Sequence, residues 1–155
     1  MLKKHSKFFE SLLLLADWFT LSLAWVSSYY LRFYSGIIPV YKGIPSFKIY
    51  LTLLVFMIPL WGLVFKVFGL YRPRRVSTRF YEILDIGKAS TFATLILISL
   101  TFLYRQYEFS RLTFFYFWLI NIVLLSLTRI LFREFLRFLR QKGYNQRYAL
   151  IIGTE

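Results

Sequence analysis

The sequence predicts an all-α membrane protein: a four-transmembrane-helix bundle with a short interfacial helix and a long fourth helix, ending in the first strand of a truncated α/β domain. Hydrophobic residues make up 58% of the 155 positions, above the roughly 45–50% of ordinary soluble domains, and the mean hydropathy is +0.56. The apolar residues gather in four runs long enough to cross a bilayer. The 20 Lys and Arg residues, against 7 Asp and Glu, lie mostly at the ends of these runs.

The composition also excludes other classes of protein. The chain has no Cys, so it is not a disulfide-stapled secreted domain, and its apolar content excludes collagen and intrinsic disorder. A net charge of +13 is typical of proteins that bind nucleic acid or anionic lipid. Because the cations flank apolar runs, we expect the lipid bilayer and its anionic lipids as partners, and no nucleic acid.

Each transmembrane helix needs about 20 mostly apolar residues. The predicted spans cover residues 9–31, 47–70, 86–104 and 112–132. The first contains one acid, Asp17, the second contains Pro59 and Lys66, and the fourth has Asn121 at its middle, where we expect a hydrogen bond between helices. A cleaved signal peptide is the alternative for the first span, but Asp17 interrupts its apolar core and apolar residues continue to Leu31.

The positions of Lys and Arg predict the orientation of the spans, since cytoplasmic loops carry the excess of positive charge. One side of the membrane holds only five of the 20 cations: Arg32, Lys42, Lys48, Arg105 and Arg111. The others lie near the N-terminus, around the loop between the second and third spans, and from the end of the fourth span onward. Both termini are therefore expected in the cytoplasm.

The loop after the second span predicts the interfacial helix. Pro73 is expected to end the second span, because proline disfavours helix in the residue before it. Ser77 or Thr78 then caps a new helix with Glu82 in its early turns. Apolar and charged residues fall on different faces of this segment, so we expect it to lie along the membrane surface and run into the third span.

The fourth helix is predicted to extend beyond the membrane. Residues 112–142 contain no Pro or Gly, so one helix of about 31 residues fits, and Gly143 suits its C-terminal end. Residues 148–152 follow a buried-strand pattern, and one strand is not stable alone. We therefore expect a transmembrane domain over residues 1–142, and in residues 143–155 a linker and the start of a truncated cytoplasmic α/β domain.

Asp17 is a candidate site residue because an acid inside the bilayer is costly and usually paired. Arg129 enters the fourth span from the same side at nearly the same depth, so we predict that Asp17 and Arg129 form an intramembrane structural pair. The alternative is a proton or cation site at Asp17, as in small four-helix multidrug exporters. His5 stands alone in a basic tail, so we predict no metal site.

Several short motifs, taken in order, resemble one family. They are Phe68-Gly69-Leu70-Tyr71-Arg72 with Arg75, Ser110-Arg111, Arg129 with Arg133, and Gly143-Tyr144-Asn145-Gln146-Arg147 leading into residues 150–154. Together they are similar to the polyprenyl-phosphate sugar-phosphate transferases of the undecaprenyl-phosphate glucose/galactose phosphotransferase type. These large bacterial phosphoglycosyl transferases start exopolysaccharide, capsule or O-antigen synthesis.

The resemblance implies four membrane helices before a Rossmann-like domain and a C-terminal catalytic domain. It implies a parent enzyme that transfers a sugar 1-phosphate from a UDP-sugar to undecaprenyl phosphate with Mg²⁺, releasing UMP. The family's catalytic Asp-Glu pair belongs to the C-terminal domain, so we assign no catalytic, cofactor-binding or metal-binding residue and expect no cofactor in this fragment. The chain would be a membrane-anchoring and oligomer-supporting domain, dimeric through its parent, in the bacterial inner (plasma) membrane.

An inner-face cluster of cations is the second candidate site, formed by Arg72, Arg74, Arg75 and Arg79. These residues are expected to hold the loop in the cytoplasm and to contact anionic lipid, including polyprenyl phosphate itself.

Two other functions remain open. Membrane-bound nucleotide-sugar dehydratases or epimerases share the layout, but their inner loop usually carries a Trp-Arg-Tyr element where this chain has Arg74-Arg75-Val76-Ser77. A self-contained small four-helix transporter that uses Asp17 is the third possibility.

Overall fold

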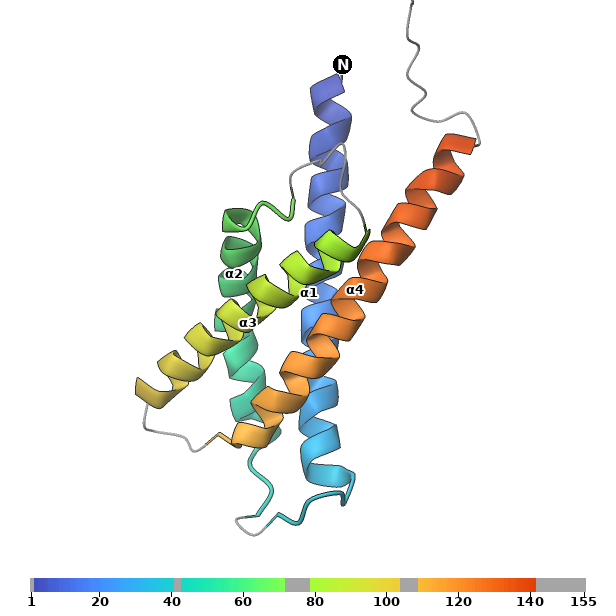
Figure 1. Ribbon diagram of the computed structural model, residues 1–155. Helices are drawn as coiled ribbons and strands as arrows, with labels where there is room; N and C mark the ends of the chain where they lie inside the picture. Colours follow the sequence, from blue (N-terminus) through green and yellow to red (C-terminus); the bar gives the residue numbers. More distant parts are fainter. Residues whose placement is uncertain (1, 41–42, 72–78, 104–108, 142–155) are drawn as a thin grey trace, which may run out of the picture.

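The computed structural model describes residues 2–40, 43–71, 79–103 and 109–141. These residues form four helices and no strand: α1 (Leu2–Tyr34), α2 (Phe47–Val67), α3 (Arg79–Leu103) and α4 (Arg111–Gln141). α1 and α2 stand nearly upright in Figure 1, whereas α3 and α4 are tilted across them. The all-helical fold class is confirmed; the strand predicted at residues 148–152 lies outside the described residues.

All four helices are long and apolar enough to cross a membrane, over the segments Glu10–Tyr34, Phe47–Val67, Phe80–Leu103 and Arg111–Phe138. Their outer faces expose large apolar side chains, among them Phe19, Val55, Leu103 and Leu131. A soluble monomer rarely exposes so much contiguous apolar surface, whereas lipid tails solvate it well. The chain is therefore a multi-pass membrane protein.

Two helices are longer than the predicted spans. α1 begins at Leu2 rather than near residue 9, because its charged first residues include good helix formers and no Pro or Gly. α3 is continuous from Arg79, so the segment expected as a short interfacial helix runs into the third membrane helix without a break. Gly87 alone does not break it. The predicted caps, Ser77 and Thr78, lie outside the described residues.

α2 ends three residues before the predicted boundary at residue 70, in a Schellman turn. The N–H of Gly69 donates to the Lys66 carbonyl at 3.1 Å, and the N–H of Leu70 donates to the Phe65 carbonyl at 3.0 Å. Gly69 has a φ of 69°, which residues with a Cβ rarely adopt. The prediction that Pro73 ends this span is wrong, because the glycine turn ends it first.

α1 packs against α2 and α4, and α3 also packs against α2 and α4. Aromatic rings fill the part of the bundle toward the end of α1. Trp25 of α1 stacks on Tyr50 of α2 with ring centroids 5.6 Å apart, and it meets Phe117 of α4 edge-on at 5.3 Å. The Trp25 Nε1 donates to the Tyr50 carbonyl at 2.8 Å. This cluster holds α1, α2 and α4 together at one end of the bundle.

Candidate functional site

Asp17 of α1 and Arg129 of α4 face each other inside the bundle. The Arg129 Nη2 donates to Asp17 Oδ2 at 2.7 Å, and each side chain is only 4% exposed. The structure thus brings together the two residues whose pairing the sequence predicts. At this distance the carboxylate and the guanidinium neutralise each other, in a setting where bulk water does not solvate them.

Thr20 and Thr128 lie next to the pair, one on each helix. Their hydroxyl oxygens are 3.1 Å apart across the contact between α1 and α4. Each hydroxyl also lies within hydrogen-bonding distance of a carbonyl one turn earlier in its own helix. The polar contact between α1 and α4 therefore extends beyond the ion pair itself.

Tyr71 covers the pair from the turn after α2. Its ring centroid lies 5.6 Å from Cζ of Arg129, and its hydroxyl interacts with the Asp17 carboxyl. Burial, followed by the negative charge of Asp17, raises the pKa of the Tyr71 phenol above its usual range. The phenol therefore stays neutral and remains able to donate a hydrogen bond.

Tyr71 was not predicted to belong to this site, although it lies in the motif Phe68-Gly69-Leu70-Tyr71-Arg72. The signal that could have found it is Gly69 followed by the apolar Leu70 at the end of an apolar helix, a pattern typical of a Schellman turn. That turn ends α2 at a depth where the next residue reaches the pair.

Three buried polar atoms of the pair have no hydrogen-bond partner among the described residues: Asp17 Oδ1, Arg129 Nε and Arg129 Nη1. One is an acceptor and two belong to donors, so a water molecule, which both accepts and donates, suits them. In the part of the chain that the structure describes, no three His, Cys, Asp or Glu side chains gather to hold a metal ion. The geometry suits a structural ion pair.

Further polar contacts join α3 to α4. Arg133, toward the C-terminal end of α4, forms an ion pair with Glu82, near the N-terminal end of α3. Nearer the middle, Asn121 Nδ2 donates to Ser90 Oγ at 3.4 Å, which is the interhelical bond expected of Asn121. Both contacts join side chains of two neighbouring helices, so we interpret them as packing interactions.

The arginine cluster is only partly visible. Arg72, Arg74 and Arg75 lie outside the described residues, and Arg79 is the first residue of α3. The predicted contact of the whole arginine cluster with lipid stays a prediction.

Taken together, the described helices define a multi-pass membrane bundle joined internally by a buried ion pair and interhelical hydrogen bonds. A family model described as a CoA-binding domain matches residues 66–155, which is more than half of the chain. The chain belongs to this family, and the domain occurs in bacterial sugar transferases. No curated protein and no solved structure matches the chain.

The family description names coenzyme A, a ligand with a nucleotide and several phosphates, but the described residues do not fit it. The matched stretch comprises the end of α2, the apolar helices α3 and α4, and residues 142–155, which are outside the described part. Three cations of α4 are already paired with carboxylates: Arg129, Arg133 and Arg137. We therefore assign no coenzyme A site to these helices.

Proposed function

We propose that the chain is the membrane-anchoring and oligomer-supporting domain of a phosphoglycosyl transferase. That enzyme would transfer a sugar 1-phosphate from a UDP-sugar to undecaprenyl phosphate and so start exopolysaccharide, capsule or O-antigen synthesis. The family match over residues 66–155, to a domain that occurs in bacterial sugar transferases, is the observation that carries this proposal. The order of motifs from Phe68 to Thr154 supports the choice of this type of transferase.

The internal contacts of the bundle support an anchoring role. Asp17 is held by Arg129 at 2.7 Å in a buried pair, so its carboxylate is not a free site for a transported ion. α4 is bound to α1 by this pair and to α3 by Arg133 and Glu82. A bundle cross-linked in this way is suited to fixing the position of an attached domain relative to the membrane. Mg²⁺ and the catalytic residues would belong to the rest of the enzyme.

The proposal predicts that this chain has no transferase activity by itself. The test is UMP release from a UDP-sugar by the purified chain in nanodiscs that contain undecaprenyl phosphate and Mg²⁺. We expect no release above a protein-free control, and release would overturn the proposal. The reading frame after Glu155 gives the second test: a continuation with a re-entrant helix and an Asp-Glu pair would support it, whereas a dehydratase or epimerase domain would overturn it.

A transport assay separates the anchor from a small transporter. Proteoliposomes with an inward or outward proton gradient are loaded with a cationic dye, and dye export is compared for the native chain and Asp17→Asn. We expect no proton-coupled export from either. Export that disappears in Asp17→Asn would show that the carboxylate is a coupling site rather than a structural partner of Arg129.

We also propose that both termini face the cytoplasm of a bacterial inner membrane and that the cluster of Arg72, Arg74, Arg75 and Arg79 secures this orientation and contacts anionic lipid. Reporter fusions at both ends measure orientation, and lipid analysis of the purified chain measures lipid contact. Changing all four arginines to Gln should weaken both. If neither changes, both roles are refuted. Mass photometry of the chain in nanodiscs tests the expected dimer.

A further inference from the structure

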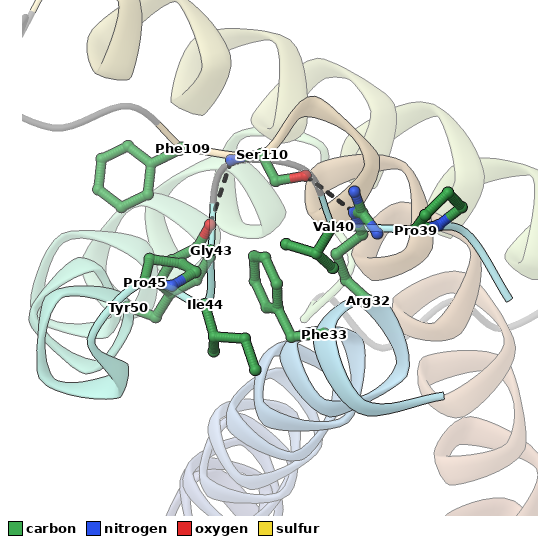
Figure 2. A pocket seen from close by; sticks show the side chains of 10 residues that line it. All are labelled: Arg32, Phe33, Pro39, Val40, Gly43, Ile44, Pro45, Tyr50, Phe109 and Ser110. Atoms are coloured by element: carbon green, nitrogen blue, oxygen red, sulfur yellow. Dashed lines mark hydrogen bonds between the residues drawn. The ribbon is translucent and has the colours of Figure 1, made fainter. Parts of the chain in front are cut away.

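A second site lies at the opposite end of the bundle from the ion pair, where α1 ends and α2 and α4 begin. A cavity of about 500 Å³ opens there between the end of α1, the following loop, the first turn of α2 and the two residues before α4. Figure 2 shows its wall, to which Arg32, Phe33, Val40, Ile44, Tyr50 and Ser110 contribute. None of the functions argued above uses this cavity.

Hydrogen bonds between the end of α1, the start of α2 and the segments next to these helices and α4 hold the polar side of the cavity in place. Arg32 Nε donates to Ser110 Oγ at 3.2 Å, and Arg32 Nη1 donates to the Ile38 carbonyl at 2.8 Å. The Ser110 N–H donates to the Tyr50 hydroxyl at 3.1 Å. Figure 2 shows two of these bonds, which link Arg32, Ser110 and Tyr50 across the cavity. The guanidinium is therefore held in place before any ligand arrives.

The charge of Arg32 has no counter-ion among the described residues. Its hydrogen bonds to described residues use Nε and Nη1, and they go to a hydroxyl and a carbonyl, which are both neutral. Within the described part of the chain, Nη2 has no hydrogen-bond partner. The N-terminus of α4, which begins at Arg111, adds partial positive charge near Ser110. A guanidinium that is held in position, with no counter-ion in the described part of the chain, favours an anion that can accept a hydrogen bond from it.

The apolar part of the cavity wall indicates which kind of molecule carries this anion. Phe33, Val40 and Ile44 give the cavity an apolar side. Ile37 and Ile44, on the loop that borders it, are 66% and 52% exposed, so the loop presents apolar side chains outward. Such a loop is stable where lipid covers it, at the membrane interface, rather than in water. Phosphate groups of phospholipids lie at that depth.

We propose that this cavity binds the headgroup phosphate of an anionic phospholipid, with Arg32 holding the phosphate and the apolar wall contacting the first part of the acyl chains. On the orientation predicted from the Lys and Arg residues, this lipid belongs to the outer leaflet. The site is separate from the arginine cluster at the cytoplasmic face, and it does not depend on the identity of the parent enzyme.

Native mass spectrometry of the full chain in detergent, titrated with dioleoylphosphatidylglycerol, tests the proposal. Arg32→Gln should weaken binding of the first lipid about tenfold or more, as expected when a charge-assisted hydrogen bond is lost. Arg111→Gln is the matched control, because it removes the same charge from an exposed residue at the same end. It should change the affinity by no more than about twofold, since it leaves the guanidinium of Arg32 in place.

Val40→Phe keeps the arginine and fills the cavity, so it tests the site even if Arg32→Gln does not fold. It too should weaken binding about tenfold, because the added ring occupies the space of the acyl chains. Circular dichroism establishes that each variant is folded. Equal losses in Arg32→Gln and Arg111→Gln, or unchanged binding in Val40→Phe, would overturn the proposal.

Two further measurements separate the lipid from other anions. Glycerol 3-phosphate should not displace the lipid at equal concentration, and displacement would show that a free phosphate is the ligand instead. Glu108 lies outside the described residues. If Glu108→Gln raises lipid affinity tenfold, that carboxylate is the partner of Arg32 and the proposal fails; an unchanged affinity supports it.

Discussion

Replacing Arg129 by Met removes the charge that faces Asp17 and keeps a side chain of similar length. The aspartate is 4% exposed, and the Arg129 Nη2 donates to its Oδ2 at 2.7 Å. At an effective dielectric constant of about 20, unit charges about 4 Å apart attract by about 4 kcal/mol, and removing one partner of a buried pair typically costs about 3–5 kcal/mol. We expect Arg129→Met to lower the free energy of unfolding by an amount in this range.

The reciprocal change, Asp17→Leu, should cost about as much, because it leaves the guanidinium buried without its carboxylate. The double variant Asp17→Leu with Arg129→Met leaves no charge unpaired. It should therefore be much more stable than the sum of the two single losses predicts. We expect the coupling between the two positions to exceed about 2 kcal/mol.

The assay is reversible unfolding in mixed micelles, with the fraction of SDS raised stepwise and helix content followed by circular dichroism. Arg137→Met is the matched control, because Arg137 is an exposed arginine of the same helix, paired with Glu134 at 3.1 Å. It should change stability by no more than about 0.5 kcal/mol. If the losses in Asp17→Leu and Arg129→Met add within about 0.5 kcal/mol in the double variant, the two side chains do not stabilise each other and the reasoning is refuted.

Three further changes test the surroundings of the pair. Gly69→Ala should destabilise the chain by about 1 kcal/mol in the same assay, because the turn needs a φ of 69°. Gly62→Ala is the control and should be tolerated, because its added Cβ would lie 3.7 Å from the nearest atom. Equal losses in the two variants would contradict the role of the turn. Glu82→Gln should lower the free energy of unfolding by less than about 1 kcal/mol, and by less still in high salt, because its ion pair with Arg133 is partly exposed. A salt-independent loss of several kcal/mol would show that this pair is buried. Because the pKa of Tyr71 is raised, the folded chain keeps a proton that the unfolded chain loses above about pH 10, so stability should fall with rising pH there. Tyr71→Phe should reduce this slope by up to about 1.4 kcal/mol per pH unit. An identical slope in both proteins would argue against burial of the phenol.

Much of the fold follows from residue order alone. Apolar runs of sufficient length separated by Lys, Arg, Gly and Pro predict four membrane helices, and the described residues form four helices long and apolar enough to cross a membrane. The boundaries are less predictable because local capping decides them. Gly69 ends α2 before Pro73 can, and α3 starts at Arg79 without a break between the surface segment and the span. Both results depend on hydrogen bonds of the backbone that composition does not report.

The Asp17 and Arg129 site shows the same division. Counting residues from the membrane boundary gives the depth of each side chain, because an α-helix rises by a fixed amount per residue. Depth was enough to suggest the pair. It could not reveal that Tyr71 covers it, because Tyr71 lies in a turn whose direction depends on the Schellman geometry.

The sequence by itself determined the presence of four apolar helices long enough to cross a membrane, and it predicted the depth of each charged residue and the side on which most cations gather. The tertiary structure decided which helices meet and which faces they turn toward each other. Helices solvated by lipid carry apolar residues on every side, so their periodicity does not mark the buried face as it does in soluble proteins. For that reason only the packed bundle shows that Arg32 meets Ser110, 78 residues away, and that these residues line a cavity at its far end.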